Sequence, residues 1–375
     1  MWKRACWLAI KEAKRDVLDE RVPFGAVGPF LEALSLTNGG TTPQVIAQDG
    51  VFQRAFLALR MCVDSFWHST RVVCLDACHI KAYYGGVVLV MTSLDGNNQV
   101  FPGAVAITES ENVDTWTLFL DLVRSAFRIG DGEGIVFLSD REKGIEAAVT
   151  QLFPHAQHAF CVYHIQKNVK VNFHTTFDGL LFQAAKADCA RTFEVVMAQM
   201  MRLDSSAGEY VSKMETRDGP EPFPGRRFGH VTFNISESMN WWLEKARYLE
   251  PVGFFSVYIR KINALFQKRR GTYFSMHPDS LQKKNVAKIL ANAVEKALSL
   301  RLVRRTPSIF EVERKDANLP FRVVNLNGRS CSCGFPQEYG IPCRHMCRAL
   351  LSLRIHPKSF VVPERSLEAL NAINS

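Results

Sequence analysis

The segment Val72–Asp140 opens with the run VVCLD (residues 72–76) and closes with IVFLSD (residues 135–140). Short apolar, β-branched runs followed by turn residues are typical of buried strands. An acidic residue just past a buried strand lies at the rim of an open α/β sheet, where ligands usually bind. Asp76 and Asp140 therefore indicate a metal site shared by two strands.

Between these two runs the sequence predicts two further strands and one helix. Residues 86–94 and 100–107 are strand-like, and turn sequences at 84–86 and 95–98 divide three strands into a meander. One apolar helix face follows, at Trp116, Phe119, Leu120, Val123 and Phe127. A helix over 145–152 and a strand over 159–162 come after Asp140. This order predicts an α/β architecture, an RNase H-like mixed sheet covered by helices.

The flanking segments divide the chain into further regions. We expect residues 1–65 to form a helical lead-in, although 52–63 is compatible with a strand or a helix. The RNase H-like domain is expected over 66–250, with an all-α insertion at about 165–230, where helical patterns replace strand runs. Residues 251–305 read as a basic helical region and 306–360 as a small cysteine-rich module.

Composition limits the class of protein. The chain has 375 residues, is 47% hydrophobic and carries a net charge of +9, which suits two or three domains and a polyanionic partner. No apolar run approaches the roughly 18 residues that cross a bilayer, and the first residues do not resemble a signal peptide. Ten cysteines without secretory targeting predict reduced thiols, a metal site, and a cytosolic or nuclear location.

Positive charge is concentrated in residues 254–305. This stretch holds twelve Lys and Arg residues against two acidic residues. A solvated helical face is the usual reason for such a stretch. In a protein with a polyanionic partner such as DNA, however, it would run along phosphates and give salt-dependent, sequence-independent affinity. The candidate DNA-binding residues are Lys268, Arg269, Arg270, Lys283 and Lys284.

The strongest local pattern lies near the C-terminus. Cys331-x-Cys333 is followed, after nine residues, by Cys343-x-His345. Three thiolates and an imidazole are the ligand set of a closed, structural Zn²⁺ site. Four unliganded surface residues are the weaker alternative, because exposed thiols at this density are a liability. Cys347 is a spare thiol that could substitute for a ligand. The spacing resembles the SWIM-type zinc finger, C-x-C-x(n)-C-x-H.

A third acidic residue is needed if Asp76 and Asp140 serve phosphodiester chemistry. Two Mg²⁺ or Mn²⁺ ions about 4 Å apart, bridged by carboxylates, are the usual device for this reaction. Glu237, in the run TFNISESMN (residues 232–240), is the candidate. The ordinary alternatives are a turn or cap residue for each aspartate and a helix capping box with Asn234 for Glu237. The spacing leaves these alternatives open.

Several motifs, in this order along the chain, resemble those of the Mutator-like element (MULE) transposases. They are LDACHIK (75–81), DGNNQ (95–99), ESEN (109–112), SDREKG (139–144), Cys161-x-x-His164 with Asn168, and residues 234–240. The resemblance extends from about residue 7 to about residue 350. It implies an RNase H-like DDE core with a helical insertion before the last acidic residue. The catalytic triad then maps onto Asp76, Asp140 and Glu237, which would bind Mg²⁺ or Mn²⁺.

Cys161 and His164 form half of a zinc site by themselves. In the family this pair lies near the active site, so the resemblance implies a supporting role, orienting DNA or the scissile phosphate. The alternative is a buried cysteine beside a histidine whose hydrogen bonds are satisfied.

The resemblance implies a DNA transposase that cleaves and transfers strands with a metal-dependent DDE triad. Its partners would be transposon ends and target DNA in the nucleus, and a homodimer or larger complex would hold two ends together. The alternatives are a domesticated, transposase-derived DNA-binding or transcription regulator without catalysis, and a metal-dependent nuclease that does not join ends. Members of this family usually carry an N-terminal zinc-binding recognition domain, and residues 1–70 hold no paired Cys and His; we therefore expect a truncated chain or another route to the terminal repeats.

Overall fold

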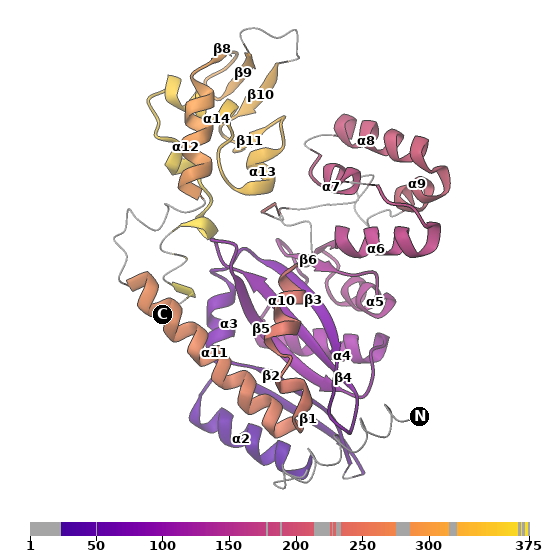
Figure 1. The fold of residues 1–375 in the computed structure, drawn as a ribbon. Coiled ribbons are helices and arrows are strands. Elements are labelled where there is room, and N and C mark those ends of the chain that lie inside the picture. The colour runs from indigo at the N-terminus through magenta and orange to yellow at the C-terminus, as the bar shows by residue number, and fades with distance from the viewer. Residues whose placement is uncertain are drawn as a thin grey trace.

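Two β-sheets organise the part of the chain that the structure describes. The computed structural model describes residues 24–49, 51–177, 179–187, 190–213, 226, 228–229, 234–274, 286–314, 321–366, 369 and 372–373. The larger sheet has seven strands in the order β1-β2-β5-β4-β3-β6-β7, and the smaller has four in the order β11-β10-β9-β8. Figure 1 shows the smaller sheet at one end of the molecule, with the larger sheet at the centre.

The centre of the larger sheet is an antiparallel meander joined to two parallel strands. The meander consists of β3 (Val72–His79), β4 (Val87–Leu94) and β5 (Val100–Thr108). β6 (Val136–Ser139) pairs in parallel with β3, and β7 (Gln157–Phe160) pairs in parallel with β6. The sequence predicts these five strands in this order, and the mixed α/β architecture is confirmed.

Two more strands extend this sheet beyond β5. β1 (Thr42–Gln48) and β2 (Val51–Ala58) form an antiparallel hairpin, and β2 pairs with β5. The expectation of a helical lead-in over 1–65 is therefore wrong for this stretch. Residues of β2 are buried on both faces of the sheet, so its apolar run has no alternation that would identify a strand. The preceding part does hold helical structure, in η1 (Phe24–Ala26) and α2 (Val27–Thr37).

Helices cover both faces of the larger sheet. On one face α3 (Arg60–Phe66), α4 (Val113–Phe127) and α5 (Lys143–Leu152) pack on Leu89 and Met91 of β4. On the other face α2, α10 (Asn234–Trp242) and α11 (Pro251–Phe274) pack on Val88 and Val90. The alternation along β4 is the period-2 pattern of a strand. In Figure 1 the long α11 runs along the sheet, and α10 lies beside β3.

A group of helices follows β7. It consists of α6 (Val162–Phe173), α7 (Leu180–Ala185), α8 (Ala190–Leu203) and α9 (Ser205–Ser212), which share a core of their own. The described residues between 162 and 213 contain no strand. The insertion predicted at about 165–230 includes these helices, and residues 214–225 of that prediction lie outside the described part.

The C-terminal module combines the smaller sheet with three helices. Its elements are α12 (Val286–Ala297), β8 (Leu300–Arg304), β9 (Ile309–Arg314), β10 (Arg322–Asn325), β11 (Ser330–Cys331), α13 (Phe335–Tyr339) and α14 (Arg344–Ser352). Leu290 and Ala293 of α12 pack with Ile341 and with Cys347 of α14. The predicted basic region 251–305 is thus divided, because α11 packs on the larger sheet and α12 on the module. The charge of a helix does not indicate which part of the protein its apolar face packs against, so the basic stretch appears as one region in the sequence.

After the module the chain returns to the larger sheet through a C-terminal segment, residues 357–366. It contains η4 (Pro357–Phe360) and η5 (Pro363–Arg365). Val362 packs with Val72 and Cys74 of β3, and Glu364 forms an ion pair with Arg71 over 3.5 Å. None of the described helices has both the length and the hydrophobicity that a bilayer crossing needs.

Candidate catalytic and zinc sites

Asp76 lies in β3, and Asp140 directly follows the parallel neighbouring strand β6. Cys74 of β3 pairs with Leu138 of β6, and each aspartate comes two residues after its member of this pair. Neighbouring strands are about 4.8 Å apart, and residues two apart point to the same face. Cys74 and Leu138 share one apolar cluster, so both aspartates lie on that side of the sheet. The structure therefore brings together the two acidic residues that the sequence singles out.

The carboxylate of Asp76 is held by two hydrogen bonds. The backbone N–H of Ala77 donates to its Oδ1 over 2.9 Å, and Nδ2 of Asn240, in α10, donates to its Oδ2 over 2.8 Å. Asn240 is not among the residues that the sequence indicates as a site, although it lies in the motif 234–240. Its only local signal is that it lies three residues after Glu237.

The surroundings of Asp76 oppose its negative charge. Burial raises the pKa of Asp76 to about 7, and the charges of Asp140 and Glu111 act in the same direction. The hydrogen bonds from Ala77 and Asn240 act against this rise in the pKa. The carboxyl group of Asp76 therefore has a pKa near neutral pH, so that its protonated and charged forms are both populated there.

Glu111 is a further acidic residue beside this pair. Burial raises its pKa, and the charges of Asp140 and Glu142 add to the effect. Its Oε1 accepts a 3.2 Å hydrogen bond from Nε1 of Trp116. Glu111 lies immediately before Asn112, the N-cap of α4. The ESEN motif contains it, but neither its spacing nor the resemblance assigns it a role.

The turn that carries Asp140 is fixed by its neighbours. Oδ1 of Asp140 accepts a 3.0 Å hydrogen bond from the N–H of Glu142. The hydroxyl of Ser139 donates to the carbonyl of Asp140 over 2.6 Å, so it accepts from Nε2 of His158 at 2.8 Å. Burial lowers the pKa of His158 to about 4, which keeps this ring neutral at physiological pH.

The third predicted acidic residue, Glu237, lies in α10. Its backbone belongs to the helix that carries Asn240, three positions earlier. Its side chain lies outside the described part of the structure.

Cys161 and His164 lie where β7 leads into α6. Cys161 is buried and packs with Cys74 and Leu138, and its N–H donates to the carbonyl of Ser139 over 2.9 Å. His164 is half-buried, and its ring contacts that of Tyr163. Within the described residues neither side chain joins a group of three metal-binding side chains. The arrangement makes Cys161 part of the core next to Asp140.

The four predicted zinc ligands converge. The ligand atoms of Cys331, Cys333, Cys343 and His345 all lie within 4.8 Å of one another, and all four residues are buried. Nδ1 of His345 lies 3.8 Å from Sγ of Cys331 and 3.7 Å from Sγ of Cys343. Hydrogen bonds from the Cys331 and Cys343 thiols lower the pKa of Cys333, which favours the thiolate that a metal requires. This ligand set fits a tetrahedral Zn²⁺ ion.

Comparison with known protein families identifies two segments. Residues 72–168 match the model of the MULE transposase domain. Residues 318–354 match the SWIM zinc finger. A search of curated proteins finds no match to this chain. The resemblance to both families is therefore confirmed for these segments.

The MULE-like segment, residues 72–168, begins with β3 and ends within α6. It contains Asp76, Asp140, Cys161 and His164, and it ends before Glu237. A transposase-like origin of this segment follows from the match. The SWIM match contains all four ligands, which supports structural zinc in the C-terminal module.

The predicted DNA-binding residues differ in their surroundings. Lys268 and Arg270 are exposed on α11, whereas Arg269 is half-buried. Nη2 of Arg269 donates to the carbonyl of Val100 over 2.6 Å, so this side chain attaches α11 to the start of β5. Lys283 and Lys284 lie outside the described residues.

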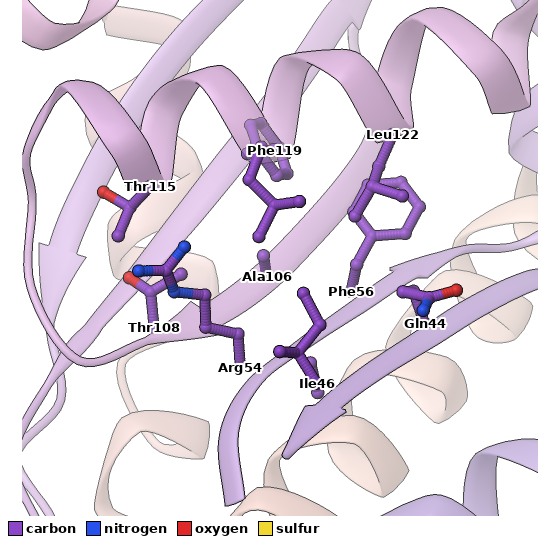
Figure 2. A pocket seen from close by; sticks show the side chains of 11 residues that line it. Gln44, Ile46, Arg54, Phe56, Ala106, Thr108, Thr115, Phe119 and Leu122 are labelled. Atoms are coloured by element: carbon purple, nitrogen blue, oxygen red, sulfur yellow. The ribbon is translucent and has the colours of Figure 1, made fainter. Parts of the chain in front are cut away.

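A small hollow between β1, β2, β5 and α4 is separate from these sites. Figure 2 shows its lining, which includes Ile46, Arg54, Phe119 and Leu122. Its volume is about 10 Å³, the size of a single water site. It contains none of the predicted site residues and is too small for a substrate.

Proposed function

We propose that this protein is a DNA transposase of the Mutator-like type, which cleaves and transfers DNA strands with Asp76, Asp140 and Glu237. The observation that carries the proposal is that Asp76 of β3 and Asp140, directly after the parallel neighbouring strand β6, lie within the MULE-like segment and repel each other's charge. Catalysis by this triad, the metal ions it uses and the DNA substrate are all parts of the proposal.

The topology of the larger sheet supports an RNase H-like core. The order β5-β4-β3-β6-β7, with three antiparallel strands followed by two parallel ones, is the arrangement that the element order of the sequence predicts. In such a core the first strand and the strand parallel to it each supply one acidic residue. β3 and the end of β6 are those two positions here.

The atoms around Asp76 and Asp140 fit a hard divalent cation. Carboxylate oxygens are the ligands that Mg²⁺ and Mn²⁺ prefer. In the described part of the chain Oδ1 of Asn240 is buried and has no hydrogen-bond partner, although its Nδ2 is bonded to Asp76. Bound cations would neutralise the transferring phosphate and activate water or a 3′-hydroxyl for in-line attack. They would also favour the charged form of Asp76, whose pKa is raised by burial and, to a lesser degree, by the charges of Asp140 and Glu111.

The side chains around the metal position have separate tasks. Asp76 and Asp140 would hold the cations at one edge of the sheet. Asn240 fixes the orientation of the Asp76 carboxylate, and the Ser139–His158 hydrogen bond fixes the turn of Asp140. Residue 237 precedes Asn240 by almost one helical turn, and residues three apart lie on neighbouring parts of one helix face. That spacing supports Glu237 as the third ligand.

DNA is the partner that the charge and the two matched segments favour. The net charge of +9 and the exposed Lys268 and Arg270 of α11 are suited to contacts with phosphates. We expect a homodimer or larger complex, because strand transfer needs two transposon ends held together, and we expect the protein to act in the nucleus.

The test is a cleavage and joining assay with the full chain. The substrate is a plasmid carrying the repeats that flank the coding region, with Mg²⁺ or Mn²⁺ added. We expect nicking and 3′-end joining in the wild type. In Asp76→Asn, Asp140→Asn and Glu237→Gln the rate should fall about a thousandfold, because each change removes several kcal/mol of charge stabilisation. Glu133→Gln, at an exposed acidic residue before β6, is the matched control and should leave the rate unchanged.

Other outcomes identify the alternatives. Nicking without joining would indicate a metal-dependent nuclease. DNA binding without nicking, unaffected by Asp76→Asn, would indicate a transposase-derived DNA-binding regulator and would contradict the proposal.

A further inference from the structure

The zinc module holds the stretch of chain that leads into α10. Nε of Arg226 donates to the carbonyl of Gln337 over 2.8 Å. The N–H of Phe228 donates to the carbonyl of Glu338 over 3.0 Å, and the N–H of Gly229 donates to Oε1 of Glu338 over 3.2 Å. Gln337 and Glu338 both belong to α13, so one short helix binds three positions of this stretch.

The contact between the stretch and α13 is close. Gly229 has a φ of +83°, and a Cβ atom at this position would lie 2.4 Å from Cε1 of the Tyr339 ring. The ring of Phe228 is buried in the cluster that contains Val362 and Leu138. Only a glycine fits at 229 without moving the tyrosine ring.

Arg365 joins this stretch to the larger sheet. Arg365 is 2% exposed, and its Nη2 donates to the carbonyl of Phe228 over 3.3 Å. The same guanidinium donates to the carbonyl of Gly96 and to Oδ1 of Asn98, both over 3.3 Å, in the β4–β5 hairpin. It also lies 5.0 Å from the centroid of the Phe228 ring. Burial lowers the pKa of Arg365 to about 10, which leaves it charged at neutral pH.

α13 is itself tied to the zinc ligands. It has five residues, too few for a stable helix in isolation, and it lies in sequence between Cys333 and Cys343. The side chain of Gln337 bonds both backbone groups of Cys331, accepting from its N–H at 3.2 Å and donating to its carbonyl at 2.9 Å. Metal binding by such a ligand set contributes directly to local folding. The position of α13 therefore depends on the zinc site.

The anchored stretch is near α10 along the chain. Only residues 230–233 separate Gly229 from Asn234, where α10 begins, and five peptide links span at most about 17 Å. From α10, Asn240 reaches Asp76. Among the described residues, the zinc site, α13 and residues 226, 228 and 229 thus form a series of contacts, and four residues of chain join this series to α10.

We propose that Glu338 and Arg365 are positioning residues, through which the zinc module sets the position of α10 relative to Asp76 and Asp140. The catalytic meaning of this role rests on the proposed function, because Glu237 lies on α10. The module then has a task inside the protein that is separate from any contact with DNA.

The test compares the full chain with three variants and one matched control. Glu338→Ala and Arg365→Gln remove contacts with residues 228–229, and Gly229→Ala introduces the overlap with Tyr339. The control is Arg348→Gln, because Nε of Arg348 donates a 2.9 Å hydrogen bond to the carbonyl of Leu300 inside the module. Zinc content, amide hydrogen exchange of residues 238–242, and cleavage kinetics are measured for each.

We expect every chain to retain one zinc ion. Amide exchange in α10 should rise about tenfold in the three variants and stay unchanged in Arg348→Gln, since loss of one charged hydrogen bond has an effect of this order. The cleavage rate at saturating DNA should fall with little change in KM. Removal of zinc from the wild type by a selective chelator should raise the same α10 exchange.

Unchanged α10 exchange in both Glu338→Ala and Arg365→Gln would overturn the proposal. The exchange measurement needs no DNA and no Mg²⁺. If the wild type does not cleave DNA, the proposed function therefore fails while this result stands by itself. If cleavage depends on Asp76 and yet the three variants match the wild type in exchange and rate, the coupling alone fails.

Discussion

Nδ2 of Asn240 donates a 2.8 Å hydrogen bond to Oδ2 of Asp76. The two residues are 164 positions apart in the sequence, one on α10 and the other on β3. This bond joins the helix that carries the third predicted acidic residue to the strand that carries the first.

Asn240→Ala should shift the pH–rate profile of DNA cleavage to higher pH. The hydrogen bond from Asn240 favours the charged form of Asp76 and lowers its pKa, so its removal raises that pKa further. We expect the rate below pH 7 to fall more than the rate above pH 8. A pH–rate profile measures the effect, with Ser238→Ala, at an exposed position of α10, as control. A uniform loss of rate at all pH values would contradict the assigned role.

Asp76→Asn should stabilise the metal-free protein at alkaline pH. The pKa of Asp76 is raised to about 7 from the ordinary value of 3.8, so the folded state binds more protons than the unfolded state between these values. Its contribution to the free energy of unfolding therefore falls as pH rises from about 4 to 7. The full difference between variant and wild type at pH 8 is at most about 4 kcal/mol.

Urea denaturation of both proteins at pH 5 and pH 8, without divalent ions, measures this difference. His158 titrates in the opposite sense, because its lowered pKa makes stability fall with acidity between pH 6.5 and 4. It is present in both proteins, so the difference between them isolates Asp76. If variant and wild type had the same pH dependence of stability, burial would not raise the pKa of Asp76.

Cys343→Ser should remove zinc, whereas Cys347→Ser should not. Cys343 belongs to the set of four converging ligands. Cys347 is buried one turn later, with its Sγ 3.8 Å from the carbonyl of Pro342. Zinc content per chain, measured with a colorimetric chelator after unfolding, distinguishes the two. Zinc loss in Cys347→Ser would mean that this thiol takes part in the site.

Gly96→Ala should destabilise the protein, because the C-terminal segment lies against the β4–β5 hairpin. A Cβ atom at residue 96 would lie 2.3 Å from the carbonyl oxygen of Glu364 and 3.0 Å from Cα of Arg365. We expect a loss of about 1–3 kcal/mol from this overlap. Gly39→Ala is the control, since nothing lies within 4 Å of its added methyl group. Thermal denaturation of the two variants should differ by several degrees, and equal melting temperatures would contradict the close contact.

Lys268→Gln and Arg270→Gln should weaken DNA binding and its salt dependence. Each lost phosphate contact lowers the slope of log K against log salt by about one. Arg269→Gln should act differently, because Arg269 donates to Val100 and its loss weakens the attachment of α11. Fluorescence anisotropy at several salt concentrations, together with denaturation curves, separates the two effects. An unchanged slope in the first two variants would exclude them from the DNA contact.

The parts of the molecule that the sequence predicts are those whose signal is local. β3 and β6 are apolar runs closed by Asp76 and by Ser139-Asp140, and the zinc ligands are two Cys-containing pairs at short spacing. Each pattern depends on a few adjacent residues. The physical requirements of a buried strand or a tetrahedral metal site therefore appear directly in the sequence.

The parts that the sequence does not predict depend on distant contacts. β2 is buried on both faces and so lacks a strand alternation. α11 and α12 both overlap the basic stretch 254–305, yet α12 packs on α14 and α11 on the larger sheet. In the turn at 95–98 the sequence favours Gly96 as the residue with a positive φ angle. In the structure, Asn98 has that positive φ angle. The glycine is required by the close approach of Glu364, 268 positions later.

Asp76 lies on an inner strand and Asp140 directly follows one, since β3 is flanked by β4 and β6, and β6 by β3 and β7. Inner strands are among the last elements to open, whereas a short helix held from outside the sheet opens at lower free energy. On gradual heating, α10 should therefore separate from Asp76 while the sheet is intact. If the proposed function holds, loss of DNA cleavage would then precede melting of the sheet, and cooling would restore cleavage without refolding of the core.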